Sequence, residues 1–187
     1  MQAIESARFS PPLPVKLLFQ DEARFGRIQD PRRCWAPTRL RPYVNYQIIR
    51  EFIYALAAVS PQKGELTSLV MPWIDSVTMS IFLAHVAHTY PDNFLIMLLD
   101  KAGWHNAKNL KVPERMKLIF LPPYSPQLNP VEHIWDHLRE NYFSNKTFNS
   151  LDEVENVLCK GLNDLFNSPE TVRSLTNFNW FNTLCLT

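Results

Sequence analysis

The sequence has little glycine and little cysteine, and each shortage argues against a class of protein. Only four glycines occur among 187 residues, and none belongs to a GxGxxG or Walker-type phosphate loop. Nucleotide-binding enzymes built on those loops are therefore disfavoured. The three cysteines are widely spaced and form no CxxC pair: Cys34, Cys159 and Cys185. This pattern argues against a disulfide framework and a zinc site, and it fits a reducing cytoplasm.

Long hydrophobic runs are missing as well. The longest, Phe52–Val59, has eight residues and is too short to span a bilayer. The first residues form neither a basic segment nor an apolar signal core, so we expect no secretion and no membrane partner. Apolar residues make up 46% of the chain and aromatics 12%, which excludes disorder. We expect a tail or linker remnant over residues 1–14 and one domain over residues 15–187.

The net charge of +1 hides an uneven distribution. Seven arginines and one acid, Asp30, lie between Arg24 and Arg50, whereas residues 151–187 carry a charge of −3. The guanidinium group matches phosphate oxygens, so the basic stretch is typical of phosphate contacts. A solvated basic loop explains the same charge equally well.

The hydrophobic pattern predicts a layered α/β domain. Strands are expected at 15–20, 52–59, 65–71, 94–99 and 116–121, and helices at 76–89, 130–142 and 150–166, with a short helix after the last one and another between the final two strands. The first three strands read as an antiparallel meander. The later apolar strands alternate with helices, so we expect them to lie parallel and covered on both faces.

Three carboxylates stand at positions where a site can form. Asp21 and Asp100 follow two apolar strands, and Glu132 lies in the first turn of a helix. Such positions can converge at one edge of a sheet. Oxygen donors without histidine or cysteine favour Mg²⁺ or Mn²⁺, and two such ions can support phosphodiester cleavage. For each residue alone, a role in a turn or helix cap is the simpler alternative.

Three blocks resemble the catalytic core of DDE transposases. They are FQDEARFG at 19–26, LDKAGWH at 99–105 and LPPYSPQLNPVEHIW at 121–135. The similarity is to the mariner-like superfamily, in its bacterial insertion-sequence 630 branch, and it covers about residues 15–145. It implies an RNase H-like mixed sheet flanked by helices. It also implies that Asp21, Asp100 and Glu132 are the catalytic, metal-binding triad, holding two Mg²⁺ or Mn²⁺ ions.

The resemblance further implies cleavage of DNA at element ends and strand transfer to a target, in the nucleoid region of a prokaryotic cytoplasm. One departure is Lys101, where such proteins often have asparagine, and this puts full activity in doubt. Further candidates for contacts to the site or to DNA are Lys101, His105, Arg24, Arg32 and Arg33. We expect Trp135 to pack in the core and Glu22 to point away from Asp21, because neighbours alternate along a strand.

Two other functions stay open: a catalytically inactive DNA-binding or assembly remnant, and another RNase H-like nuclease. The proline-rich loop before Glu132 disfavours the second. The resembled family carries helix-turn-helix modules ahead of its core, and only 20 residues precede Asp21 here. We therefore expect a truncated copy or the downstream half of a split transposase, with the upstream half and further copies of the chain as partners on DNA.

Overall fold

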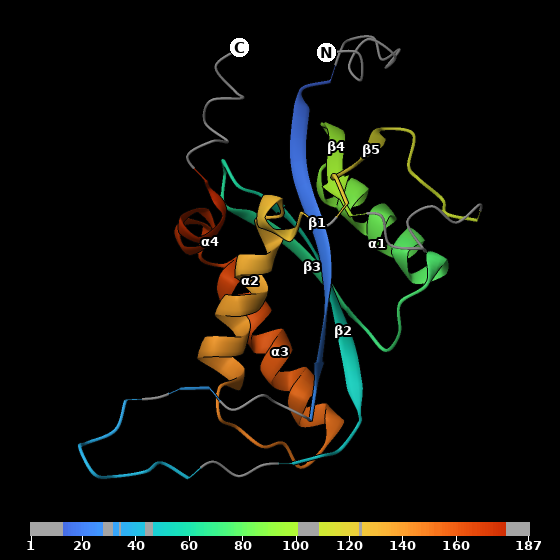
Figure 1. Cartoon of the computed structure of the whole chain (residues 1–187). Helices are drawn as coiled ribbons and strands as arrows, with labels where there is room; N and C mark the ends of the chain where they lie inside the picture. Colours follow the sequence, from blue (N-terminus) through green and yellow to red (C-terminus); the bar gives the residue numbers. More distant parts are fainter. Residues whose placement is uncertain are drawn as a thin grey trace.

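Five strands form one mixed sheet at the centre of the molecule (Figure 1). The computed structural model describes residues 13–27, 32–33, 35–43, 47–100, 109–123 and 125–178. The strands are β1 (Val15–Gly26), β2 (Phe52–Ser60), β3 (Glu65–Met71), β4 (Phe94–Leu99) and β5 (Met116–Phe120). They lie in the order β3-β2-β1-β4-β5, with the first three antiparallel and β4 and β5 parallel to β1. The predicted meander followed by parallel strands is confirmed.

Helices cover both faces of this sheet. Helix α1 (Ser76–Thr89) lies on one side, and Figure 1 shows the other helices on the opposite side. These are α2 (Val131–Leu138), the π-helical turn η3 (Arg139–Phe143), α3 (Leu151–Phe166) and α4 (Pro169–Thr176), with the short 3₁₀ turn η2 (Pro126–Leu128) before α2. None of the helices in the described ranges is both long and apolar enough to cross a membrane.

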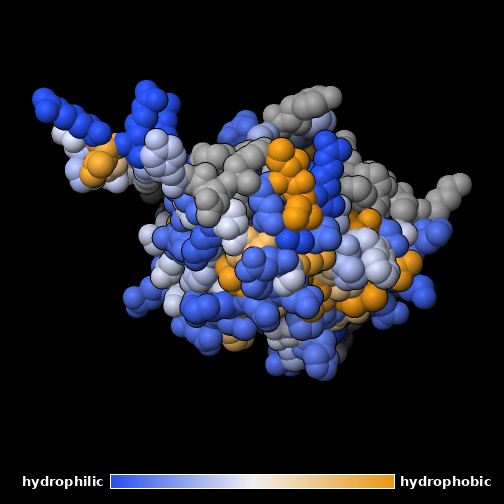
Figure 2. Space-filling view, turned by 90° about the horizontal axis from the view of Figure 1, so that it is seen from below, coloured by the Kyte–Doolittle hydropathy of each residue, from blue (hydrophilic) through white to orange (hydrophobic). Residues whose placement is uncertain are grey.

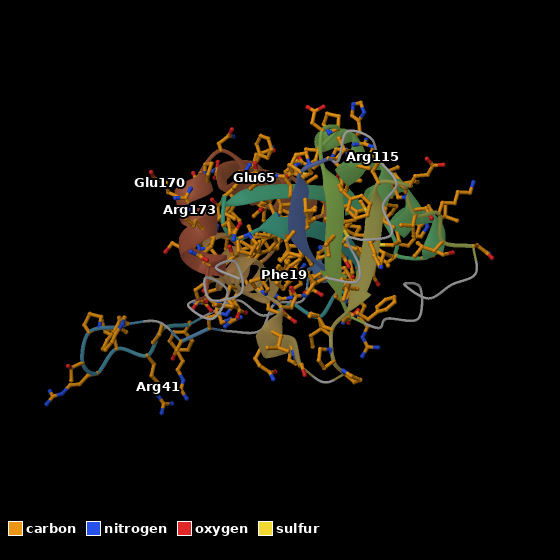
Figure 3. All side chains as sticks on the ribbon, turned by 90° about the horizontal axis from the view of Figure 1, so that it is seen from above. Phe19, Arg41, Glu65, Arg115, Glu170 and Arg173 are labelled. Atoms are coloured by element: carbon orange, nitrogen blue, oxygen red, sulfur yellow. The ribbon has the colours of Figure 1, made fainter. Side chains whose placement is uncertain are left out.

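The alternation of side chains along β1 divides the interior into two cores. Phe19, Ala23 and Phe25 pack against α2, α3 and α4, whereas Leu18 packs against α1. Successive residues of a strand point to opposite faces, which is why odd and even positions separate in this way. Figure 3 shows Phe19 in the middle of the packed interior. Asp21 shares the odd positions and therefore faces the side of the sheet that α2 covers.

Some element ends differ from the predictions. Strand β1 continues to Gly26 instead of ending at Gln20, because its pairing with β2 extends to Gly26 opposite Phe52. The cap of α1 is Asp75 instead of Ser76: its carboxylate accepts the backbone N–H groups of Val77 and Thr78. Most of the expected tail, at 1–12, lies outside the described residues, as do 101–108, where the short helix between the last two strands was expected.

Candidate active site

The register of the sheet puts Asp21 and Asp100 at the same level on neighbouring strands. Strands β1 and β4 run parallel, and Phe19 pairs with Leu98 at the end of their ladder. Asp21 and Asp100 each lie two residues beyond that pair, and neighbouring strands are about 4.8 Å apart. Leu98 packs on the same side as Phe19, so an extension of the alternation puts both carboxylates on the side of α2.

Glu132 reaches the same place from the first turn of α2. Pro130 occupies the start of this helix with φ −66°, and proline suits that position because no intrahelical partner is needed for its missing N–H. Negative charge from Asp100 raises the pKa of Glu132, and Glu132 in turn raises the pKa of Asp21. Glu132 therefore interacts with both aspartates, one within β1 and one directly after β4.

The electrostatics of Asp21 are unfavourable to its charged form. Burial, followed by the charges of Glu132 and Glu22, raises the pKa of Asp21 to about 8. Burial is also the main cause that raises the pKa of Glu132, and the nearby Arg139 opposes it. A carboxylate held near other carboxylates in a poorly hydrated place stays ionised at neutral pH only when a cation offsets the charge.

Trp135 donates a hydrogen bond from its indole Nε1 to Oδ2 of Asp21, at 2.8 Å. Its side chain is only 1% exposed and packs edge-on against Phe25, with ring centroids 6.0 Å apart. The prediction that Trp135 packs in the core is confirmed. The hydrogen bond was missed, because its acceptor lies 114 residues earlier in the chain and no local pattern indicates it.

Oxygen donors dominate the surroundings of Asp21, and this donor set suits a hard divalent cation. Within the described ranges, no group of three or more acidic, histidine or cysteine side chains has an arrangement that could hold a metal ion. Burial and the charges of Glu132 and Glu22 raise the pKa of Asp21, and a divalent cation at this position would favour its ionised form. The residues therefore fit Mg²⁺ or Mn²⁺ in chemical character.

The predicted arginine contacts are spread over different surfaces. Arg24 lies over the ring of Phe52 and, as an even position of β1, on the face opposite Asp21. Arg32 is tied to the α2 side: its backbone N–H donates to Asn145, and its guanidinium lies 3.8 Å from Glu140. Arg33 is exposed. Lys101 and His105 lie outside the described residues.

The stretch between β1 and β2 forms an arm, residues 35–43, that projects from the body of the molecule. Figure 3 shows Arg41 on this arm, far from the sheet, and Figure 2 shows the arm as a mainly hydrophilic projection. Trp35 and Tyr43 on the arm are almost fully exposed, at 104% and 98%. Arg39 has a φ of 77°, the left-handed conformation that non-glycine residues rarely adopt.

Arg139 is a cation near the site that was not among the sequence candidates. Its charge lowers the pKa of Glu132, seven residues earlier, and its guanidinium lies 5.5 Å from the centre of the Phe25 ring. Arg139 directly follows α2, about two helical turns beyond Glu132, and is the first residue of η3. This spacing is visible in the sequence and could have identified Arg139.

Comparisons with known structures find the same fold in solved transposase complexes. A pre-cleavage Mos1 transpososome matches 87% of this chain and 56% of its own chain, with a TM-score of 0.59 and 11% identity. A Mos1 mariner paired-end complex with Mn matches 95% and 59%, with a TM-score of 0.57 and 12% identity. These likenesses show the fold, which is RNase H-like. The chain spans somewhat more than half the length of the Mos1 chains.

Sequence comparisons give the family. Protein y4pE/y4sA of Sinorhizobium fredii, which is described as uncharacterized, is 38% identical over 128 residues, 68% of this chain and 95% of its own length. The model of the family described as "DDE superfamily endonuclease" matches residues 16–155, which include all three carboxylates of the site. The chain therefore belongs to the DDE superfamily endonucleases.

Proposed function

We propose that this chain is the catalytic core of a DNA transposase of the mariner-like, insertion-sequence 630 type. Its activity would be cleavage of phosphodiester bonds at element ends and transfer of the freed 3′ hydroxyl to a target. Asp21, Asp100 and Glu132 would hold two Mg²⁺ or Mn²⁺ ions through their carboxylate oxygens. Such ions supply an activated nucleophile and stabilise the leaving oxygen.

The observation that supports the proposal is the electrostatic coupling of Glu132, in the first turn of α2, to both Asp21 and Asp100. Asp21 lies within β1, and Asp100 directly follows its parallel neighbour β4, each two residues beyond the last paired residues of the two strands. If Asp21 had a purely structural role, we would expect its surroundings to stabilise the ionised form of its carboxylate. Its surroundings instead raise its pKa to about 8, and this cost is explained if the position serves a cation.

DNA is the partner that the chemistry requires. The acidic site repels phosphates, so cations near it must draw the DNA backbone in, and Arg32 and Arg139 lie on the side of α2 where this is possible. The catalytic unit would extend over residues 15–187. An upstream DNA-binding half, an oligomer on DNA and contacts from Lys101 and His105 stay predictions of the sequence.

Nicking of supercoiled plasmid tests the proposal. The full chain should convert plasmid to the open circle in the presence of Mg²⁺ or Mn²⁺, and Asp100→Asn should lower the rate by at least ~100-fold, because asparagine keeps the size of the side chain but loses the charge that holds the cation. Asp92→Asn is the matched control, since Asp92 is exposed and precedes the other end of β4.

The Asp92→Asn chain should nick at the wild-type rate, and both variants should melt near the wild-type temperature. Undiminished nicking by Asp100→Asn would exclude Asp100 from the site. A folded wild-type chain that binds DNA but never nicks it, with either metal, would instead identify an inactive DNA-binding remnant.

A further inference from the structure

Two buried side chains attach the segment that carries Glu132 to strand β1, one at the carbonyl that precedes Asp21 and one at the Asp21 carboxylate. Asn129 donates from Nδ2 to the carbonyl oxygen of Gln20, at 2.9 Å. Trp135 donates from Nε1 to Oδ2 of Asp21, at 2.8 Å. The two bonds join residues 109 and 114 positions apart, so they are tertiary contacts between α2 and the sheet.

Asn129 connects the helix start and the strand through one amide group. Its side-chain Oδ1 accepts the backbone N–H of Val131 at 3.2 Å, which satisfies one of the free donors at the start of α2. Its Nδ2 reaches β1 at the same time, and the residue is only 5% exposed. The start of α2 is therefore fixed relative to the residue that precedes Asp21.

Trp135 makes the second attachment, one helical turn beyond Glu132. The ring is fixed by the edge-on contact with Phe25, on the same face of β1 as Asp21. A buried indole N–H needs an acceptor, and here that acceptor is the carboxylate itself. The backbone of Glu22 also donates a hydrogen bond to this carboxylate.

The spacing of the two attachments brackets Glu132. Glu132 and Trp135 lie three residues apart in α2 and share one side of that helix, and Asn129, in an extended conformation, lies two residues before its first residue. The attachments therefore hold the side of α2 that carries Glu132 against the strand that carries Asp21.

We propose that Asn129 and Trp135 are positioning residues that form a two-point clamp between α2 and β1 and hold Glu132 opposite Asp21. The proposal deepens the proposed function and rests on it, since the clamp would prepare this carboxylate pair for divalent cations. Hydrogen-bond partners of metal ligands commonly determine how tightly a metal binds. The clamp explains why a buried tryptophan and a buried asparagine flank the acid.

The first test is the metal dependence of plasmid nicking by the full chain. Trp135→Phe removes the indole donor and keeps an aromatic ring, and Asn129→Ser keeps a capping hydroxyl that is too short to reach Gln20. Each variant should need about tenfold more Mg²⁺ for half-maximal nicking, with most of the rate recovered at saturating Mg²⁺. An unchanged Mg²⁺ requirement in both variants would overturn the clamp.

Phe143→Leu is the matched control for loss of packing. Phe143 is 1% exposed, lies in the same core and packs on Phe25 at 5.0 Å, yet its side chain has no group that can bond a carboxylate. This variant should lose thermal stability as Trp135→Phe does and keep the wild-type Mg²⁺ requirement. An equal rise of the requirement in Phe143→Leu would assign the effect to packing and overturn the clamp.

The second test does not depend on catalysis. In an NMR spectrum of the indole N–H groups, the Trp135 signal is the one missing from Trp135→Phe, and its exchange with solvent should be slow. Asp21→Ala should accelerate this exchange at least ~10-fold, whereas Asp100→Asn should leave it unchanged. Equal exchange in Asp21→Ala and wild type would overturn the clamp even if the protein nicks DNA. Accelerated exchange in a chain that never nicks would refute the proposed function and support the clamp.

Discussion

Asp21 combines two demands that oppose each other at the scale of a single residue. Its carboxylate is held by the indole of Trp135 in the interior, which fixes its position, while burial and the charges of Glu132 and Glu22 penalise its ionised form. Residues arranged for a reaction often cost the fold stability in this way. The cost should be measurable in the absence of metal.

Replacement of this carboxylate should therefore stabilise the metal-free protein at alkaline pH. The pKa of Asp21 is about 8 in the folded chain and near 3.8 when unfolded, so the folded state binds more protons between these values and stability falls as pH rises through them. Asp21→Asn removes this loss and still offers an oxygen to Trp135. Its melting temperature in EDTA should exceed that of wild type by several degrees at pH 8 and by little at pH 4.5.

Thermal melts from pH 4.5 to 9 measure this difference. Asp92→Asn, at an exposed aspartate, serves as the control and should follow the wild-type curve. A constant offset between Asp21→Asn and wild type over the whole range would contradict the raised pKa.

Among the elements, the segment between β1 and β2 departs most from the layered body. Near Arg32 it is attached to the turn after η3, where Asn145 accepts the backbone N–H of Arg32 and donates to its carbonyl. Beyond that point the arm at 35–43 leaves the surface (Figure 2). Its base therefore lies on the α2 side of the sheet.

Charge removal at the base of this segment should weaken DNA binding in a salt-dependent way. Arg32→Ala with Arg33→Ala should make the slope of log K against log salt shallower by about one for each lost phosphate contact. Fluorescence anisotropy with a random-sequence duplex, from 50 to 300 mM KCl, measures the slope.

The control removes two positive charges elsewhere. Lys63 and Arg173 are both exposed. Gly64, next to Lys63, lies against the backbone of Arg173, so the two cations lie on the same surface. Lys63→Ala with Arg173→Ala therefore removes two positive charges away from the Arg32 segment. This pair should leave the slope as in wild type. A wild-type slope for Arg32→Ala with Arg33→Ala would indicate that the segment is a solvated basic loop without phosphate contacts.

Local patterns predicted the elements well and their tertiary attachments poorly. The strands Phe52–Ser60 and Phe94–Leu99 were predicted well, because their apolar residue types and the turns that bound them are visible in the local sequence. Strand β1 is longer than predicted, because the residues after Gln20 pair with β2. This partner lies too far along the sequence for a local pattern to indicate it. The bond from Trp135 to Asp21 escaped prediction for the same reason.

In the whole molecule, two cores on opposite faces share one sheet, and the acidic site lies at the border of only one of them. The core with α1 contains Leu18, Leu56 and Phe82 and carries none of the three carboxylates. The other packs α2, α3 and α4 against Phe19 and Phe25, and its edge carries the site. Ligands of the site should therefore stabilise the docking of α2 and, through it, the complete fold.

Divalent cations should accordingly raise the melting temperature of the full chain. An ion that binds the folded state alone contributes about 2.7 kcal/mol at a hundredfold excess over its Kd, or roughly 5–10 °C for a chain of this size. The shift on adding MgCl₂ at pH 7.5 should be present in wild type and lost in Asp100→Asn. Equal shifts in the two proteins would indicate ion binding elsewhere.

The central position of β1 also bears on when the protein can act during its synthesis. Asp21 leaves the ribosome early, but its strand needs β4, whose paired residues lie 79 positions further along, and its carboxylate needs an indole 114 positions away. Contacts of such high sequence separation form late in folding, because the loop between them must close first. A nascent chain that ends before α2 lacks Glu132 and both attachments of the clamp. The proposed cutting activity therefore requires synthesis of the chain through α2, so shorter nascent chains should leave DNA near the ribosome uncut.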